Sequence, residues 1–214
     1  FPTRRTARYF TLEEPSAPIT QVWIACHGYG QLAEFFVRYF EVLKAPGTLV
    51  VAPEAMNRFY LNGTYGRVGA TWMTKEDRLT DIDDYVHYLD QLYHTLAETY
   101  DLQQAVVNVF GFSQGGATVC RWVANRQVPV DNLILWAGTF PLDFNVEADR
   151  DYFNSLNIQL LAGDEDEYAN SERLQELHQF LQDRGIQYRF TPFKGKHTVV
   201  PEVLRDLAAF LAGH

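Results

Sequence analysis

Short apolar segments alternate with longer segments of helical spacing along the whole chain. The short segments are nearly continuous runs rich in β-branched residues, instead of runs in which apolar and polar positions alternate. Such continuous runs are typical of strands in a parallel sheet that is covered on both faces. We expect strands of this kind at Gln21 to Cys26, Thr48 to Ala52, Ala105 to Phe110, Leu133 to Trp136 and Ile158 to Ala162.

The segments between these runs carry apolar residues at steps of three and four. The clearest spans Thr80 to Tyr100, where Thr80 or Asp81 could cap the start of a helix. Further helices are expected around residues 174–181, ending at Gly185, and around residues 203–211. Strands that alternate with helices predict an α/β fold with one mostly parallel sheet. Arg8 to Leu12 could add an antiparallel edge strand.

Composition narrows the class of protein. The chain has 214 residues, of which 47% are hydrophobic and 21% charged, as expected for one globular domain spanning residues 1–214. No apolar run approaches the roughly 18 residues that cross a bilayer, so we expect no transmembrane segment. The net charge of −9 argues against nucleic acid as a partner. Two cysteines are too few for a disulfide scaffold.

A serine turn follows one of the predicted strands. Gly111-Phe112-Ser113-Gln114-Gly115 lies between the strand that ends at Phe110 and an apolar segment, Ala117 to Val123. In this setting the Gly-x-Ser-x-Gly pattern indicates a tight strand-to-helix turn that exposes a nucleophilic serine. The amide of Gln114 would then face a developing oxyanion. The alternative is an ordinary glycine turn.

A serine nucleophile needs a histidine base that is oriented by a carboxylate. In this architecture the chain order is serine, acid, histidine. Of the histidines after Ser113, His178 lies in a predicted helix and His214 is the last residue. His197 remains, in a loop after the candidate strand Tyr188 to Pro192. The acid would be one of the four in Gly163-Asp164-Glu165-Asp166-Glu167, which could alternatively form a cation-binding loop.

A second oxyanion donor is expected after the first predicted strand. His27-Gly28-Tyr29-Gly30 forms a His-Gly turn, and in α/β-hydrolases such a turn supplies an amide to the oxyanion, here that of Tyr29. His27 would then brace the loop. A dinucleotide-binding loop is the weaker alternative, because the third glycine and a later acid are absent. We expect both Cys26 and Cys120 to be buried.

Together these residues resemble the phospholipase/carboxylesterase family of α/β-hydrolases, which includes the acyl-protein thioesterases. The resemblance rests on segments spread over nearly the whole chain: His27 to Gly30, Val51-Ala52-Pro53-Glu54-Ala55, Trp72, Gly111 to Ala117 and the late Asp and His. It implies an α/β-hydrolase fold without a large lid domain and no cofactor. Independently of the resemblance, no histidine pair has the spacing of metal ligands with an acid nearby, so we expect no metal site. In family members with a similar Gly-Asp-x-Asp stretch the second Asp is the triad acid, which implies Asp166. A small-molecule ester or thioester is the expected partner.

Three departures from the family fall in loops that shape the acyl pocket. Asp166 is followed by Glu167-Tyr168-Ala169-Asn170 instead of a proline, Gln31 stands where Asp is frequent, and Met73-Thr74 follow Trp72. We expect the segment from Arg58 to Trp72, with Phe59, Tyr65 and Trp72, to line the substrate pocket. A structural surface loop is the alternative.

The sequence therefore predicts a serine carboxylesterase with Ser113, Asp166 and His197 as the triad and the amides of Tyr29 and Gln114 as the oxyanion hole. A thioesterase or peptidase would use the same triad. A binding module that kept the fold and lost the chemistry is an alternative of another class. We expect a cytoplasmic protein. The sequence does not decide whether it forms a homodimer or whether a targeting segment was removed before Phe1.

Overall fold

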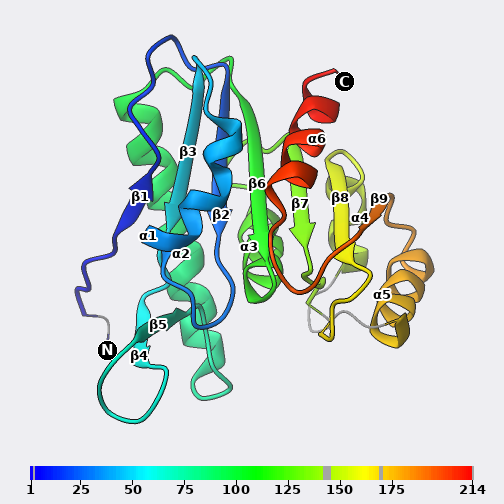
Figure 1. Ribbon diagram of the computed structural model, residues 1–214, viewed down its shortest axis with the longest axis horizontal. Coiled ribbons are helices and arrows are strands. Elements are labelled where there is room, and N and C mark those ends of the chain that lie inside the picture. Colours follow the sequence, from blue (N-terminus) through cyan, green and yellow to red (C-terminus); the bar gives the residue numbers. More distant parts are fainter. Residues whose placement is uncertain (2, 142–145, 169–170, 214) are drawn as a thin grey trace.

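The computed structural model describes residues 1, 3–141, 146–168 and 171–213. Ala169, Asn170 and His214 therefore lie outside the described residues. Within them, seven strands form one sheet in the order β1-β3-β2-β6-β7-β8-β9 (Figure 1). The strands are β1 (Tyr9–Thr11), β2 (Gln21–Cys26), β3 (Thr48–Pro53), β6 (Val106–Phe112), β7 (Asn132–Trp136), β8 (Asn157–Gly163) and β9 (Arg189–Phe193).

The sheet is parallel except at one edge, where β1 runs antiparallel to β3. This confirms the α/β class, the five predicted central strands and the antiparallel edge strand. In the described ranges no large lid domain is inserted between the strands, and no helix is long and apolar enough to cross a membrane.

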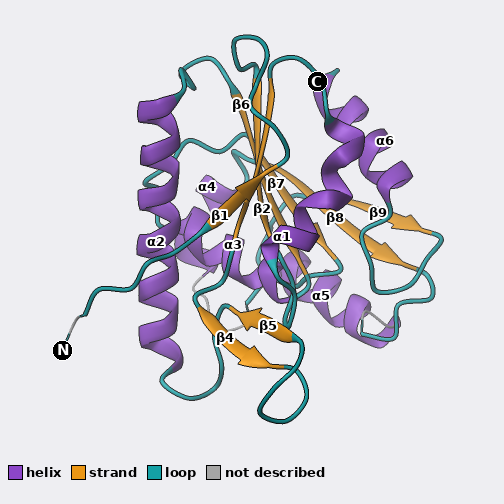
Figure 2. Ribbon diagram, turned by 60° about the vertical axis from the view of Figure 1, so that its left-hand side comes forward, coloured by secondary structure: helices purple, strands orange, loops and turns teal. Residues whose placement is uncertain are grey.

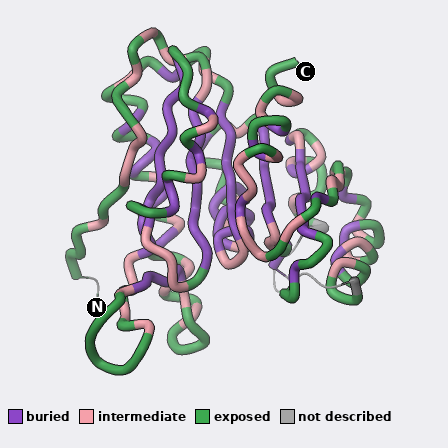
Figure 3. Tube along the Cα trace, viewed as in Figure 1, coloured by how far each residue is buried: buried purple, intermediate pink, exposed green. Residues whose placement is uncertain are grey.

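Helices cover both faces of the sheet (Figure 2). One face carries α2 (Arg78–Thr99), α3 (Gln114–Ala124), α4 (Val146–Phe153) and α5 (Ser171–Asp183), and the other carries α1 (Ala33–Phe36), η1 (Val37–Leu43) and α6 (Pro201–Ala212). Along β2, Val22 and Ile24 pack toward the first group, while Trp23 and Ala25 pack toward the second. Both sets are buried, which explains why the strands are apolar without interruption (Figure 3).

The start of α2 differs from the prediction. The helix begins at Arg78 with Asp77 as its capping residue, so Thr80 and Asp81 lie inside the first turn. Thr80 donates a hydrogen bond to the Asp77 carboxylate over 2.9 Å. The first turn is largely exposed, and an exposed turn has no apolar period that could mark its beginning.

A two-stranded hairpin lies in a segment where the sequence predicted no strand. β4 (Asn57–Tyr60) pairs antiparallel with β5 (Val68–Thr71), within the segment from Arg58 to Trp72 and its immediate neighbours. The hairpin projects from the end of the sheet where the parallel strands finish (Figure 1). Parallel sheets bind ligands at their carboxyl ends, so this hairpin stands beside the position where a site is expected.

Candidate active site

Ser113 occupies a strained turn between β6 and α3. Its φ of 53° and ψ of −116° lie in a region that residues with a side chain rarely adopt, and such backbone costs about 1–3 kcal/mol. Packing enforces the turn, because a Cβ on Gly111 would lie 2.4 Å from the Gly115 carbonyl oxygen. A Cβ on Gly115 would lie 2.2 Å from the Cys26 oxygen. Only glycine fits at either position.

His197 lies between Ser113 and Asp166. Its Nε2 is 2.9 Å from Ser113 Oγ, and its Nδ1 is 2.8 Å from Asp166 Oδ2. An ionised carboxylate can only accept, so the proton on this side belongs to Nδ1. Nε2 is then free to accept the Ser113 hydroxyl proton. The loops that follow β6, β8 and β9 thus bring together the three side chains that the sequence singled out.

Asp166, and not Asp164, contacts His197. Asp166 is buried, and its second oxygen accepts a hydrogen bond from the Tyr168 amide over 2.8 Å. Asp164 is exposed and accepts instead from the Gly195 amide over 3.0 Å, in the loop that carries His197. The two loops also meet at Gly163, where a Cβ would lie 2.2 Å from the Gly195 oxygen. Asp164 therefore links the loop that carries His197 to its own loop, the acid loop of residues 163–167.

Two aromatic rings pack on His197. The Phe112 ring centroid lies 4.9 Å from the imidazole and that of Tyr168 lies 4.8 Å from it. Sequence reasoning missed both contacts, although Phe112 belongs to the serine motif and Tyr168 to the loop that departs from the family. These rings restrict the imidazole to the plane that reaches both partners.

The amide of Tyr29 lies in the loop between β2 and α1. The neighbouring amides are already bonded, because Gly28 N donates to Gln31 Oε1 over 2.8 Å and Gly30 N donates to the Ala70 oxygen over 2.8 Å. Among the hydrogen bonds of the described residues, none uses the Tyr29 amide. Gln114 is the first residue of α3, where amides have no acceptor within the helix. Both amides can therefore donate a hydrogen bond to an oxygen of a bound molecule.

His27 supports this loop from inside the protein. Its Nδ1 donates to the Gly28 oxygen over 2.7 Å, and its Nε2 accepts from the Ala55 amide over 3.1 Å. Burial lowers the pKa of His27 to about 4. The imidazole is therefore neutral near neutral pH, and backbone groups occupy both of its nitrogens. The Trp72 indole N–H donates to the His27 carbonyl oxygen over 2.9 Å and fixes the same residue from the other side.

The Gln114 side chain links the serine turn to the end of β5. Its Nε2 donates to Thr71 Oγ1 and to the Met73 oxygen, both over 2.9 Å. Its Oε1 accepts from the Trp72 amide over 3.1 Å. No sequence signal indicated this link, because the partners are more than 40 positions apart along the chain. These hydrogen bonds fix the position of the hairpin relative to the serine turn.

Glu54 anchors the same hairpin to the sheet. The buried carboxylate accepts from Arg8 Nε and Arg58 Nε, each over 2.7 Å, and from the Ala33 amide over 3.3 Å. Burial alone would raise the pKa of Glu54, but the hydrogen bonds and charges of the two arginines outweigh it and hold the pKa below its ordinary value. One charged residue thus joins α1, β4 and the residue that precedes β1.

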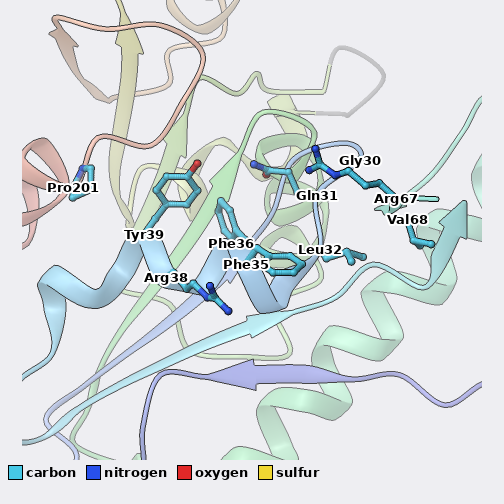
Figure 4. A pocket seen from close by; sticks show the side chains of 10 residues that line it. All are labelled: Gly30, Gln31, Leu32, Phe35, Phe36, Arg38, Tyr39, Arg67, Val68 and Pro201. Carbon is cyan, nitrogen blue, oxygen red and sulfur yellow. The ribbon is translucent and has the colours of Figure 1, made fainter. Parts of the chain in front are cut away.

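A cavity of about 700 Å³ opens near the loop that follows β2 (Figure 4). It lies between the Tyr29 loop, α1 with η1, the hairpin and the first residue of α6. Its lining includes Gly30, Gln31, Phe36, Arg38, Tyr39 and Arg67. The segment from Arg58 to Trp72, which the sequence predicted to line the substrate pocket, thus contributes to this cavity through Arg67 and Val68.

The three predicted pocket residues lie elsewhere than in this lining. Trp72 is 2% exposed and Tyr65 is 81% exposed, so the first is buried structure and the second faces solvent. Phe59 packs with its ring centroid 5.1 Å from that of Tyr29, beside the predicted oxyanion amide. A direct contact between these residues and a substrate stays a prediction.

Two other kinds of site are not found in the part of the chain that the structure describes. Cys26 and Cys120 are unbonded and buried, and burial raises the pKa of both thiols. No group of three His, Cys, Asp or Glu side chains in the described ranges is placed to hold a metal ion. The four-acid loop, considered above as a cation site, uses Asp166 on His197 and Asp164 on a backbone amide.

A mostly parallel sheet with a serine on the glycine-flanked turn after its central strand defines an α/β-hydrolase. Sequence comparison shows that the chain belongs to the phospholipase/carboxylesterase family, whose profile matches residues 7–214. Comparison with curated proteins gave no significant match.

Solved structures agree on the fold. Acyl-protein thioesterase 2 of Zea mays is 18% identical, with a TM-score of 0.76 over 97% of this chain and 99% of that one. Esterase PE8 is 22% identical, with a TM-score of 0.75 over 98% and 99%. A carboxylesterase from Mesorhizobium loti is 16% identical, with a TM-score of 0.69 over 95% and 94%.

Proposed function

We propose that this protein is a serine hydrolase that cleaves carboxylic esters through an acyl-enzyme. The observation that carries the proposal is the placement of His197 within hydrogen-bond distance of both Ser113 Oγ and Asp166. Family membership supports a hydrolase in general, and the residue roles rest on this geometry.

In the first half of the reaction, Ser113 Oγ attacks the ester carbonyl while its proton passes to His197 Nε2. The carbonyl oxygen becomes negative, and the amides of Tyr29 and Gln114 stabilise it. The positive end of α3 adds to this stabilisation. Asp166 keeps the proton on Nδ1 and stabilises the imidazolium. When the carbon–oxygen bond to the alcohol breaks, His197 returns the proton to the departing oxygen.

In the second half, water clears the acyl group from Ser113. His197 takes a proton from the water as it attacks the acyl carbonyl, and the same amides hold the oxyanion. The bond to Ser113 Oγ then breaks, the serine regains its proton from His197, and the carboxylic acid leaves. Every proton that moves passes through one nitrogen, His197 Nε2.

A panel of 4-nitrophenyl esters of increasing chain length tests this proposal, with the matching acyl thioesters measured beside it. We expect ester hydrolysis by the wild-type protein and none by Ser113→Ala at equal folded content. Thioester turnover that greatly exceeds ester turnover would instead favour a thioesterase, the named activity of the maize neighbour. A folded wild-type protein that cleaves neither substrate and resists serine-directed reagents would indicate a binding module.

A further inference from the structure

The charged residues that line the cavity are positive, although the protein is acidic. The net charge of the chain is −9, yet two arginines, Arg38 and Arg67, line this cavity. No aspartate or glutamate is among the described residues that line it. A neutral or cationic substrate group gains nothing from this arrangement, whereas an anionic group does.

Neither arginine forms an ion pair in the part of the chain that the structure describes. Among the ion pairs and side-chain hydrogen bonds of the described residues, none involves the guanidinium of Arg38 or Arg67. Arg38 lies over the Phe35 ring, 5.2 Å from its centroid, which positions the group without cancelling its charge. Glu54, whose carboxylate accepts from the Ala33 amide at the start of α1, is already bonded to Arg8 and Arg58.

Further polar groups accompany the arginines. Figure 4 shows the Tyr39 hydroxyl, the Gln31 amide and the Arg67 guanidinium along one side of the cavity, with the Phe36 ring beside them. Gln31 Oε1 accepts from the Gly28 amide over 2.8 Å, so its NH₂ group is the part left to donate elsewhere.

Two residues of the cavity lining lie in the chain segments that carry predicted catalytic groups. Gln31 follows the Tyr29 loop by two positions, and Pro201 begins α6 directly after the His197 loop. The Phe36 ring centroid lies 6.1 Å from that of Phe112, whose ring packs on His197. A molecule held in this cavity therefore lies next to the loops that carry the Tyr29 amide and His197.

We propose that this cavity binds a carboxylate group of the ester substrate, with Arg67 and Arg38 as specificity-determining residues. The proposal rests on the proposed ester hydrolysis and adds the chemical class of the substrate to it. The aromatic and aliphatic parts of the lining accommodate the carbon chain between the ester and the carboxylate.

Substrate pairs that carry either a free or a methylated carboxyl group test the proposal, with cleavage followed at the 4-nitrophenyl or acetyl ester that both members share. One pair places the carboxylate on the acyl side: 4-nitrophenyl hydrogen suberate and its methyl ester. The other places it on the alcohol side: 4-acetoxybenzoic acid and its methyl ester. We expect the wild-type protein to have a higher kcat/KM for the acid in one of the two pairs, and that pair identifies the side of the ester that enters the cavity.

Substitution of the arginines should remove this preference selectively. Arg67→Gln and Arg38→Gln should each lower kcat/KM for the acid about fivefold, the equivalent of roughly 1 kcal/mol for an exposed charge pair, and lower kcat/KM for the neutral ester much less. Arg67→Glu should reverse the preference. Added salt should weaken the wild-type preference, because the arginines are exposed. Arg184→Gln, at the end of α5, makes the same change in net charge away from the cavity and should have no effect.

Two outcomes would overturn the inference: a wild-type preference for the neutral ester in both pairs, or arginine variants that affect acid and neutral ester equally. These outcomes differ from failure of the proposed function. In that case neither the acids nor the neutral esters would be cleaved, and Ser113 would not react with a fluorophosphonate. Melting temperatures of all variants confirm equal folding.

Discussion

The serine turn and the tip of the hairpin are both glycine-rich, but their glycines do different work. At the serine turn, a Cβ on Gly111 or Gly115 would lie 2.4 or 2.2 Å from a backbone oxygen. At the hairpin tip, a Cβ on Gly63 or Gly66 would meet nothing within 4 Å. Packing requires glycine at the first pair, whereas at the second pair only the positive φ angle of the backbone favours it. Packing therefore excludes other residues at the two glycines of the serine turn, whereas the hairpin tip has space for a side chain.

The largest contrast is expected from adding one methyl group in each region. Gly115→Ala should abolish esterase activity and lower the melting temperature strongly, because the backbone around Cys26 and Gly111 cannot move apart. Gly63→Ala adds a methyl group in open space at a φ of 64°, which costs about 1–2 kcal/mol and leaves activity intact. Thermal unfolding and ester turnover of both variants check this. Equal effects at the two sites would contradict the contrast.

The next largest effect concerns the two aspartates of the acid loop. Asp166→Asn leaves His197 without its orienting carboxylate and should lower kcat by about 10⁴-fold at unchanged fold, the size of the loss for a triad aspartate in serine proteases. Asp164→Asn keeps a side-chain oxygen for the Gly195 amide and should retain most activity. Turnover numbers measured beside melting temperatures distinguish them. An inactive Asp164→Asn together with an active Asp166→Asn would show that the roles are reversed.

A smaller effect is expected on stability in acid. The pKa of His27 is about 4 in the folded protein because of burial, against 6.5 when unfolded. Below pH 6.5 the unfolded chain therefore binds a proton that the folded protein refuses, and stability falls until about pH 4. Between pH 7 and 4.5 this amounts to about 2–3 kcal/mol.

His27→Gln removes this titration, and its side-chain oxygen can still accept from the Ala55 amide. Its stability deficit relative to wild type should shrink as the pH falls from 7 to 4.5, as measured by urea unfolding. A deficit that stays constant over this range would show that His27 is not held neutral.

The smallest effect is expected at the exposed end of the hairpin. Tyr65 is 81% exposed, so Tyr65→Ser should change the free energy of unfolding by less than about 0.5 kcal/mol. Activity toward short esters should stay at the wild-type level. A several-fold rise in KM with long-chain esters alone would show that Tyr65 contacts the acyl chain, as the sequence suggested.

The same contrast explains how far the sequence could be interpreted. Strands buried on both faces have a continuous apolar pattern, so the central strands were predictable. The serine turn was predictable because its glycines are sterically required, and His197 because chain order left one histidine in a suitable loop. Spacing alone did not separate Asp164 from Asp166, since both follow the same strand; the family resemblance supplied that choice.

The cavity wall could not be predicted in the same way. The hairpin, α1 and η1 are short, and their aromatic residues follow no clear period. The Gln114 bonds to Thr71 and Met73, and the arginines around the cavity, depend on contacts between segments far apart in the chain. Such contacts leave no local trace in a single sequence.

The central claim is that Ser113 is the nucleophile activated by His197. Its most direct test is reaction with a fluorophosphonate, followed by mass spectrometry of the labelled peptide. We expect one phosphonyl group per chain, attached to Ser113 in the wild-type protein. We expect no labelling and no ester hydrolysis in folded Ser113→Ala. A label on another residue, or hydrolysis that persists in Ser113→Ala, would contradict the account.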